Sequence, residues 1–204
     1  CTIDPANGHW EVITTSASGR PLRAPNDLVF GPDGALYFTD PDDFAPEEDL
    51  HGWICRHTPE GTELRHELGN TFPNGIAFGP DGRLVWTESH MKRPVGETPD
   101  GGWEPRAQLG DETIPDGCAY AADGSLMVAT LFSGGLDLVT WEAGEARSER
   151  ITWDPEVMPT NCAFDGSALI VTDVSSSWDK ALDTGKLWRL ETTLDGLPLR
   201  TPAP

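Results

Sequence analysis

Residues 25–40 have the sequence PNDLVFGPDGALYFTD, and three later stretches repeat its order of proline, polar residue, apolar run and tight turn. The later stretches are PNGIAFGPDGRLVWTES at 73–89, PDGCAYAADGSLMVAT at 115–130 and PTNCAFDGSALIVTD at 159–173. Their prolines lie 48, 42 and 44 residues apart. An internal repeat of this kind predicts one structural unit that is used four times.

Each repeat is predicted to begin with a β-hairpin. In the first repeat, Leu28–Phe30 is a short apolar strand, and 31–34 is a tight turn because proline presets φ and glycine accepts a positive φ. Residues 35–39 form the returning strand. Weaker strand candidates follow at 53–56 and 63–66, so each repeat would contain four strands. Four strands in about 40–50 residues are typical of a propeller blade.

The sequence therefore predicts an all-β propeller of about four and a half blades. Residues 1–24 contain one expected strand pair and are interpreted as the outer strands of a blade. Complete blades are expected in the four ranges that start near the repeat prolines: 25–72, 73–114, 115–158 and 159–204. Residues 185–190 are expected to supply a strand of the last blade. A closed four-bladed ring is the alternative, but it leaves residues 1–24 without a role.

The charge of the chain limits the partners that we expect. Acidic residues outnumber basic ones 34 to 14, and the formal net charge is −20. Such a chain repels nucleic acid and anionic lipid and attracts cations. The alternative is that most carboxylates only maintain solubility. No apolar run reaches the roughly 18 residues of a membrane span, and no signal peptide is visible, which slightly favours a cytoplasmic location.

Four cysteines are present, and none forms a CxxC pair, which argues against a structural zinc site. Cys118 and Cys162 lie in apolar runs and are expected to be buried. The chain has no GxSxG nucleophile motif, no HExxH motif and no dinucleotide or phosphate-binding loop. Any catalysis must therefore use other groups.

One polar residue follows each repeat proline and opens the innermost strand of its blade. Innermost strands line the channel of a propeller, so these residues should converge there: Asn26, Asn74, Asp116 and Thr160. Amide and carboxylate oxygens are hard ligands that suit calcium, magnesium or manganese. Asparagine and aspartate could instead cap strand ends or form Asx-turns. Three such residues at one repeat position favour the metal site.

The four repeated stretches resemble the senescence marker protein, gluconolactonase and luciferin-regenerating enzyme family, which includes regucalcin. They occur in the order of that family and near its spacing, and the resemblance covers nearly the whole chain. Family members are six-bladed propellers. The resemblance thus implies that the first blade and the inner strands of the second are missing, and that the five ranges above belong to blades two to six. A truncated gene prediction, an incomplete sequence or a true short form would each explain this.

The resemblance also implies roles for individual residues. The metal of the family is held by a glutamate in blade one, an asparagine and an aspartate, and Asn74 and Asp116 match the last two. Asn26 matches an asparagine that contacts substrate or metal-bound water. The glutamate has no counterpart here, so we expect weak metal binding, and an inactive fragment is an alternative for the chain alone. Arg23 lies one position from a substrate-binding arginine of the family and is otherwise a surface cation.

The residues that end each returning strand should lie on the same face as Asn26. They are candidates for the rim of a substrate pocket, with solvated loop residues as the alternative: Asp40, Glu88, Ser89, His90, Thr130 and Asp173. His90 could shuttle a proton near neutral pH, or be an ordinary surface histidine. The substrate-binding candidates are Asn26, Arg23, Glu88, His90 and Thr160.

The resulting hypothesis is a metal-dependent hydrolase that opens a small, sugar-derived lactone. One divalent cation, which could be calcium, zinc, magnesium or manganese, would polarise the lactone carbonyl. Asp116 would be the catalytic base. Two alternatives remain open: a non-catalytic propeller that binds a ligand, and a phosphotriester hydrolase like the related diisopropyl fluorophosphatase.

Overall fold

The computed structural model describes residues 1–45, 49–174 and 185–201. These residues form nineteen β-strands and no α-helix, which confirms the all-β prediction. Consequently, no helix in this part of the chain is long and apolar enough to cross a membrane.

Four antiparallel sheets follow the four sequence repeats, with the strands of each sheet in chain order. The first sheet contains β5 (Leu28–Phe30), β6 (Leu36–Asp40), β7 (Trp53–Thr58) and β8 (Gly61–Glu67). The second contains β9 (Pro73–Phe78), β10 (Leu84–Glu88), β11 (Arg93–Glu97) and β12 (Trp103–Pro105). The third contains β13 (Ile114–Tyr120), β14 (Leu126–Leu131), β15 (Gly135–Glu142) and β16 (Glu145–Ile151). The fourth contains β17 (Pro159–Asp165), β18 (Ala168–Asp173) and β19 (Lys186–Glu191).

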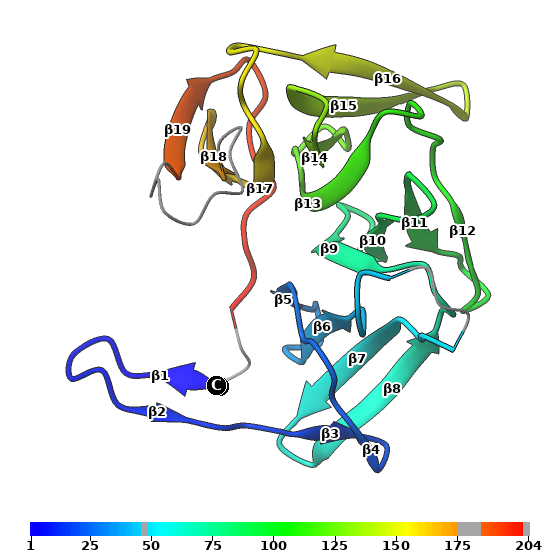
Figure 1. Ribbon diagram of the computed structural model, residues 1–204, viewed down its shortest axis with the longest axis vertical. Coiled ribbons are helices and arrows are strands. Elements are labelled where there is room, and N and C mark those ends of the chain that lie inside the picture. Colours follow the sequence, from blue (N-terminus) through cyan, green and yellow to red (C-terminus); the bar gives the residue numbers. More distant parts are fainter. Residues whose placement is uncertain (46–48, 175–184, 202–204) are drawn as a thin grey trace.

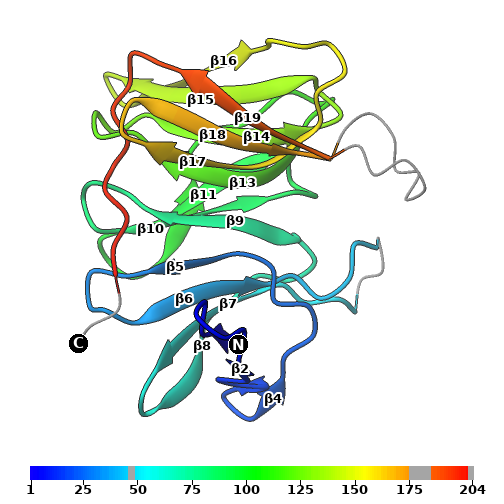
Figure 2. The same cartoon turned by 90° about the vertical axis from the view of Figure 1, so that its left-hand side faces the viewer.

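The sheets succeed one another around an arc, with β5, β9, β13 and β17 on its inner side (Figure 1). The view turned by 90° shows these four strands side by side, each in its own sheet (Figure 2). This is the radial arrangement of a propeller, and every repeat proline lies within three residues of the start of an inner strand. The numbering of the sheets as blades three to six stays a prediction.

Residues 1–24 form two short hairpins where the sequence predicted one. The first pairs β1 (Thr2–Ile3) with β2 (Trp10–Glu11), and Figure 1 shows it projecting away from the sheets. The second pairs β3 (Ser16–Ala17) with β4 (Arg20–Pro21). It lies against β8, since the Ser18 backbone N–H donates to the Thr62 carbonyl.

The hydrophobic core lies between neighbouring sheets rather than at the centre of the arc. One cluster joins the first two sheets, and in it the rings of Tyr37 and Phe78 meet edge-on with centroids 5.1 Å apart. Two further clusters join the second sheet to the third and the third to the fourth. Cys118 and Cys162 are buried in them, as the sequence predicted. Burial of apolar surface therefore holds each sheet to the next.

A C-terminal strap, residues 195–200, crosses the open side of the arc after β19 (Figure 1). Its backbone bonds to two sheets, because the Leu197 N–H donates to Tyr120 O at 3.0 Å and the Gly196 N–H donates to Gly166 O at 2.9 Å. The Arg200 guanidinium lies over the ring of Phe78, 5.6 Å from its centroid. The strap thus contacts the ends of three inner hairpins.

Glycines allow the inner strands to approach one another. A Cβ atom on Gly75 would lie 2.5 Å from both the Asp116 carbonyl oxygen and the Gly117 Cα. A Cβ atom on Gly117 would lie 2.7 Å from the Asn161 Cα. Backbone atoms cannot move aside as a side-chain tip can, so only glycine fits at these positions.

We predict that Gly117→Ala lowers the free energy of unfolding by about 3 kcal/mol, because the added methyl group forces β13 and β17 apart. Gly110→Ala is the matched control, since its Cβ would meet only Thr113 Cγ2 at 3.9 Å. Its effect should stay within about 1 kcal/mol. Urea denaturation of both variants measures the difference, and equal stabilities would show that the close approach is not a constraint.

Candidate functional site

The inner strands and the strap enclose a cavity of about 370 Å³ at the centre of the arc. Its walls are mostly apolar, and Asp27 and Asn161 contribute polar side chains. Asn74 and Asp116 lie one glycine before the wall residues of β9 and β13. They therefore stand at the end of the cavity where the inner strands begin.

Hydrogen bonds between sheets hold Asn74 and Asp116 in place. The Thr39 hydroxyl of the first sheet donates to Asn74 O at 2.8 Å, and the Thr87 hydroxyl of the second donates to Asp116 O at 2.6 Å. The Asn74 Nδ2 donates to Ser89 Oγ at 3.4 Å, and Ser89 Oγ donates to Pro115 O at 2.5 Å. Each residue is thus fixed by the sheet before it.

The carbonyl oxygen of the Asn74 side chain has no hydrogen-bond partner in the described part of the chain, although the residue is only 6% exposed. Burial of a polar atom without a partner is unfavourable, and such atoms are rare in folded proteins. The Asn74 side chain also hydrogen-bonds to the Asp116 carboxylate and so lowers its pKa, which places the unpaired Oδ1 and the carboxylate in one buried cluster. This pair of oxygens suits a hard divalent cation.

Asp116 carries an unusual carboxyl group. Burial raises its pKa to about 7, and the charge of Asp27 adds to the rise, while Asn74 and the Gly117 backbone N–H oppose it. A positive charge next to the carboxyl would reverse the effect, because it would stabilise the ionised form. The site is therefore electrostatically prepared for a cation.

Asp27 is a site residue that the sequence analysis missed. Its carboxylate accepts hydrogen bonds from the Leu28 N–H at 2.9 Å and from the Ile76 N–H of the next sheet at 3.2 Å. Burial raises the pKa of Asp27, and these N–H groups and the Asn161 side chain lower it in part. The sequence does distinguish this residue, because Asp27 occupies the repeat position that is glycine in the second and third repeats.

The other predicted channel residues are not brought to Asn74 and Asp116 by any side-chain contact among the described residues. Asn26 and Arg23 are exposed, and their backbone N–H groups donate to Thr39 O and to the Asp40 carboxylate. The Thr160 hydroxyl lies 2.8 Å from the Thr172 hydroxyl within its own sheet.

Most of the predicted rim residues lie inside the sheets instead. Asp40 and Asp173 are buried and accept backbone N–H groups from just before the repeat prolines, at Ala24 and Met158. Thr130 is buried and donates to Gly135 O.

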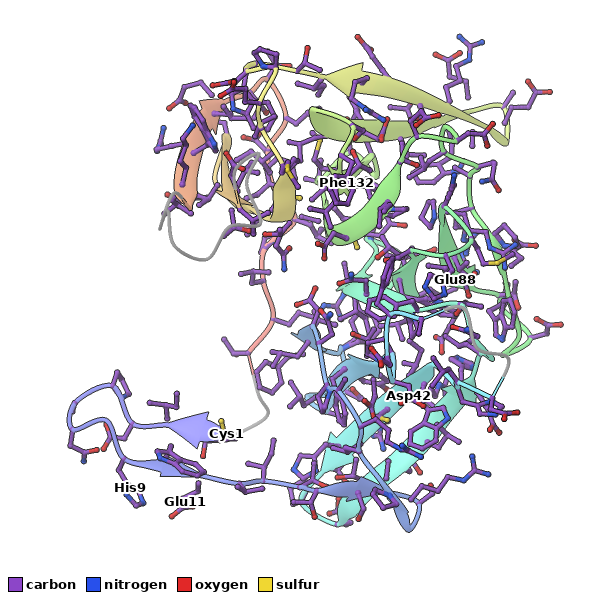
Figure 3. All side chains as sticks on the ribbon, in the orientation of Figure 1. Cys1, His9, Glu11, Asp42, Glu88 and Phe132 are labelled. Carbon is purple, nitrogen blue, oxygen red and sulfur yellow. The ribbon has the colours of Figure 1, made fainter. Side chains whose placement is uncertain are left out.

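Glu88 is fully buried, and its carboxylate accepts a hydrogen bond from Arg93 Nε at 2.8 Å. In Figure 3 it lies farther from the inner side of the arc than β9 does. Because the Glu88 carboxylate is covered and paired with Arg93, it is not accessible to a ligand in the cavity. A residue at the end of a returning strand pairs with the start of the inner strand, which explains why these side chains serve the fold.

His90 differs from its neighbours in the predicted rim set. It is half-buried, its Nδ1 lies 3.4 Å from Asn70 O, and its ring packs against Phe44 and Phe72. Among residues 1–45, 49–174 and 185–201, no group of three or more His, Cys, Asp or Glu side chains is arranged to hold a metal ion. Any cation here would rely on the amide of Asn74.

A sequence profile described as the SMP-30/Gluconolactonase/LRE-like region matches residues 1–175. A comparison with curated protein sequences gave no significant match. Among solved structures, a gluconolactonase from Xanthomonas campestris is 25% identical with a TM-score of 0.69, over 94% of this chain and 64% of that one.

Two further structures share the fold. The calcium-binding protein regucalcin from Agrobacterium tumefaciens is 21% identical with a TM-score of 0.70, over 88% of this chain and 64% of its own. A luciferin-regenerating enzyme is 21% identical with a TM-score of 0.69, over 87% and 64%. The chain thus spans just under two thirds of the length of each of these three structures.

We predict that Asp116→Asn stabilises the metal-free chain at pH 8. An acid whose pKa is higher in the folded chain than its ordinary 3.8 binds its proton more tightly when folded. The folded state therefore loses stability as the pH rises from about 4 to about 7, and neutral asparagine avoids this loss. Denaturation in the presence of a chelator should show a gain of a few kcal/mol at pH 8 and a smaller one at pH 5.

Asp33→Asn is the control, and we expect it to change the stability of the chain in the opposite direction. Although burial raises the pKa of Asp33, hydrogen bonds from Arg56, Ala35 and Tyr37 lower it overall, so its ionised form stabilises the fold. Its replacement should destabilise the chain at pH 8. If Asp116→Asn also destabilised the chain at pH 8, the carboxyl would not be under electrostatic strain.

Proposed function

Because the chain belongs to the SMP-30/gluconolactonase/LRE-like family, we propose that it carries the cation-binding centre of a sugar-lactone hydrolase. The observation that supports this most directly is the unpaired Oδ1 of Asn74, a buried residue whose side chain contacts the Asp116 carboxylate. A buried oxygen without a donor is what a cation ligand leaves behind when no cation is present. The whole-protein activity is part of the proposal, since the chain spans only part of the compared structures.

The residues at the centre fit one divalent cation, which could be calcium, zinc, magnesium or manganese. Asn74 Oδ1 and the Asp116 carboxylate would hold it, and Asp27 is a further carboxylate whose charge acts on Asp116. When bound, the cation would supply Lewis-acid polarisation of the lactone carbonyl. The net charge of −20 would raise the local concentration of such cations.

The catalytic role belongs to Asp116 in this proposal. A carboxylate at the end of the cavity could take the proton of the water that attacks the lactone carbonyl. Thr87 fixes the backbone of Asp116 by the hydrogen bond to Asp116 O, and the carboxylate projects from this fixed strand position. Ser89 similarly orients the Asn74 amide through Nδ2, which leaves Oδ1 directed away from that contact.

Substrate binding would involve the exposed polar residues near the first inner strand. The side chains of Asn26 and Arg23 are exposed, so they could bind the hydroxyl groups of a sugar lactone. Thr160 could contribute its hydroxyl from the last sheet, where it is paired only with Thr172. Glu88 is left out of this set because it is buried against Arg93.

A cation-binding module without catalysis is the second candidate. It is favoured by the small number of ligands, since the described residues bring together one amide and one carboxylate and place Asp27 next to them. Two protein oxygens leave most of the coordination sphere of a calcium ion open. Binding and hydrolysis must therefore be measured separately.

We predict that calcium, manganese, magnesium or zinc raises the melting temperature of the chain, and that Asp116→Asn removes this shift because the carboxylate ligand is lost. In the same samples, acid release from glucono-δ-lactone should fall by about 100-fold or more in the variant. Asp123→Asn, an exposed carboxylate bonded to Ser125, is the control.

Each result has a distinct meaning. A cation-dependent shift of the melting temperature without lactone hydrolysis would favour the binding module. Hydrolysis of a phosphotriester but not of the lactone would favour a phosphotriester hydrolase. Retention of most of the lactonase rate by Asp116→Asn would refute the assigned base.

A further inference from the structure

Three aromatic rings form a cluster beside the cation-binding centre: Phe44, Phe72 and His90. The ring centroids of Phe44 and Phe72 are 4.8 Å apart, those of Phe44 and His90 are 4.7 Å apart, and those of Phe72 and His90 are 5.5 Å apart. All three pairs meet at an angle rather than face to face. Two rings of this aromatic cluster, Phe44 and His90, line a surface cavity of about 450 Å³ together with Ala45 and Asn70.

The cluster is joined to the centre through the backbone. The Ser89 N–H donates to Phe72 O at 3.0 Å, and the Ser89 hydroxyl is the partner of the Asn74 amide. The His90 N–H donates to Thr71 O at 3.2 Å. Phe72 and Asn74 are separated by one proline, so the cluster and the proposed ligand are also close along the chain.

The cluster is not an ordinary part of the hydrophobic core. Phe44 is 54% exposed, whereas the core clusters between sheets are made of buried side chains. Phe72 has a φ of +52°, a conformation that bulky residues rarely adopt and that the hydrogen bond from Ser89 helps to maintain. Phe72 packs against Phe44 and His90, the two rings that line the cavity, and backbone strain of this kind clusters at binding sites.

The chemistry of the cluster identifies what it would bind. Its rings offer apolar faces, and none of them supplies the several donors and acceptors that a bare polyol needs. We infer that the aromatic cluster binds an alkyl or aryl substituent carried by the lactone whose carbonyl lies at Asn74 and Asp116. The inference rests on the proposed function, and it narrows the substrate to a lactone with an apolar group. The substituent would cover the exposed face of Phe44 and so gain from burial of apolar surface.

Two lactones with the same ring test this subsite: δ-valerolactone, which has no substituent, and δ-undecalactone, which carries a hexyl chain. The wild-type chain should show a higher kcat/KM for δ-undecalactone, and Phe44→Ala should lower the ratio of the two kcat/KM values about tenfold. Phe44→Leu should keep most of the ratio, because it keeps an apolar surface. Trp10→Ala removes an exposed aromatic on the projecting hairpin and should not change the ratio.

The outcomes separate this inference from the proposed function. If Phe44→Ala lowers both kcat/KM values equally, Phe44 acts on the fold and the subsite is refuted. If the wild-type chain hydrolyses glucono-δ-lactone but neither of these two lactones, the subsite is refuted and the proposed function stands. If it hydrolyses none of the three, the hydrolase proposal fails, and calorimetric binding of 6-hexylpiperidin-2-one, a lactam that resists hydrolysis, then decides the subsite. Weaker binding by Phe44→Ala but not by Trp10→Ala would support it, and equal binding by all chains would refute it.

Discussion

The close approach of the inner strands at Gly75 and Gly117 is the constraint on which the centre depends. With a side chain at either position, the backbones of β9, β13 and β17 could not meet at their first residues. Their meeting brings Asn74 and Asp116 together from different sheets. The threonine bonds to their carbonyl oxygens, from Thr39 and Thr87, then fix the position of each residue along its strand.

The close approach of the inner strands also makes the centre energetically unfavourable in the metal-free chain. Two carboxyl groups, Asp27 and Asp116, lie in a poorly solvated place, and burial raises the pKa of both. The unpaired oxygen of Asn74 adds a further cost. Natural proteins retain such groups mainly at functional sites, where a ligand compensates for them. The stability of the apolar contacts between sheets is what allows the chain to maintain this arrangement.

The sequence predicted the sheets because the repeat is local: proline, apolar strand, turn and returning strand recur at nearly constant spacing. It also predicted that Asn74 and Asp116 would be neighbours, since equivalent positions of successive blades face one channel. It missed Asp27, because only the residue directly after each repeat proline was considered as a channel residue. It also did not predict that Asp40, Asp173 and Glu88 are buried, because their burial depends on partners brought together by tertiary structure.

Those three side chains satisfy backbone or charged groups of their own sheets, such as the Ala24 N–H for Asp40 and Arg93 for Glu88. A sequence pattern shows that a polar residue ends a strand but not which donors lie within its reach. Partnerships of this kind depend on tertiary distances, as does the strained conformation of Phe72. The repeat fixes the order of the sheets, and tertiary packing decides which polar residues serve structure.

The strap at residues 195–200 gives the last sheet a second connection to its neighbour. It bonds to Tyr120 and Ala122 on one side and to Gly166 on the other, and Gly196 fits against Phe164 only because it lacks a side chain. The strap therefore links the third and fourth sheets by hydrogen bonds, in addition to the apolar contacts between them. They should open as one cooperative unit in amide exchange, so that a break in the strap would loosen two sheets at once.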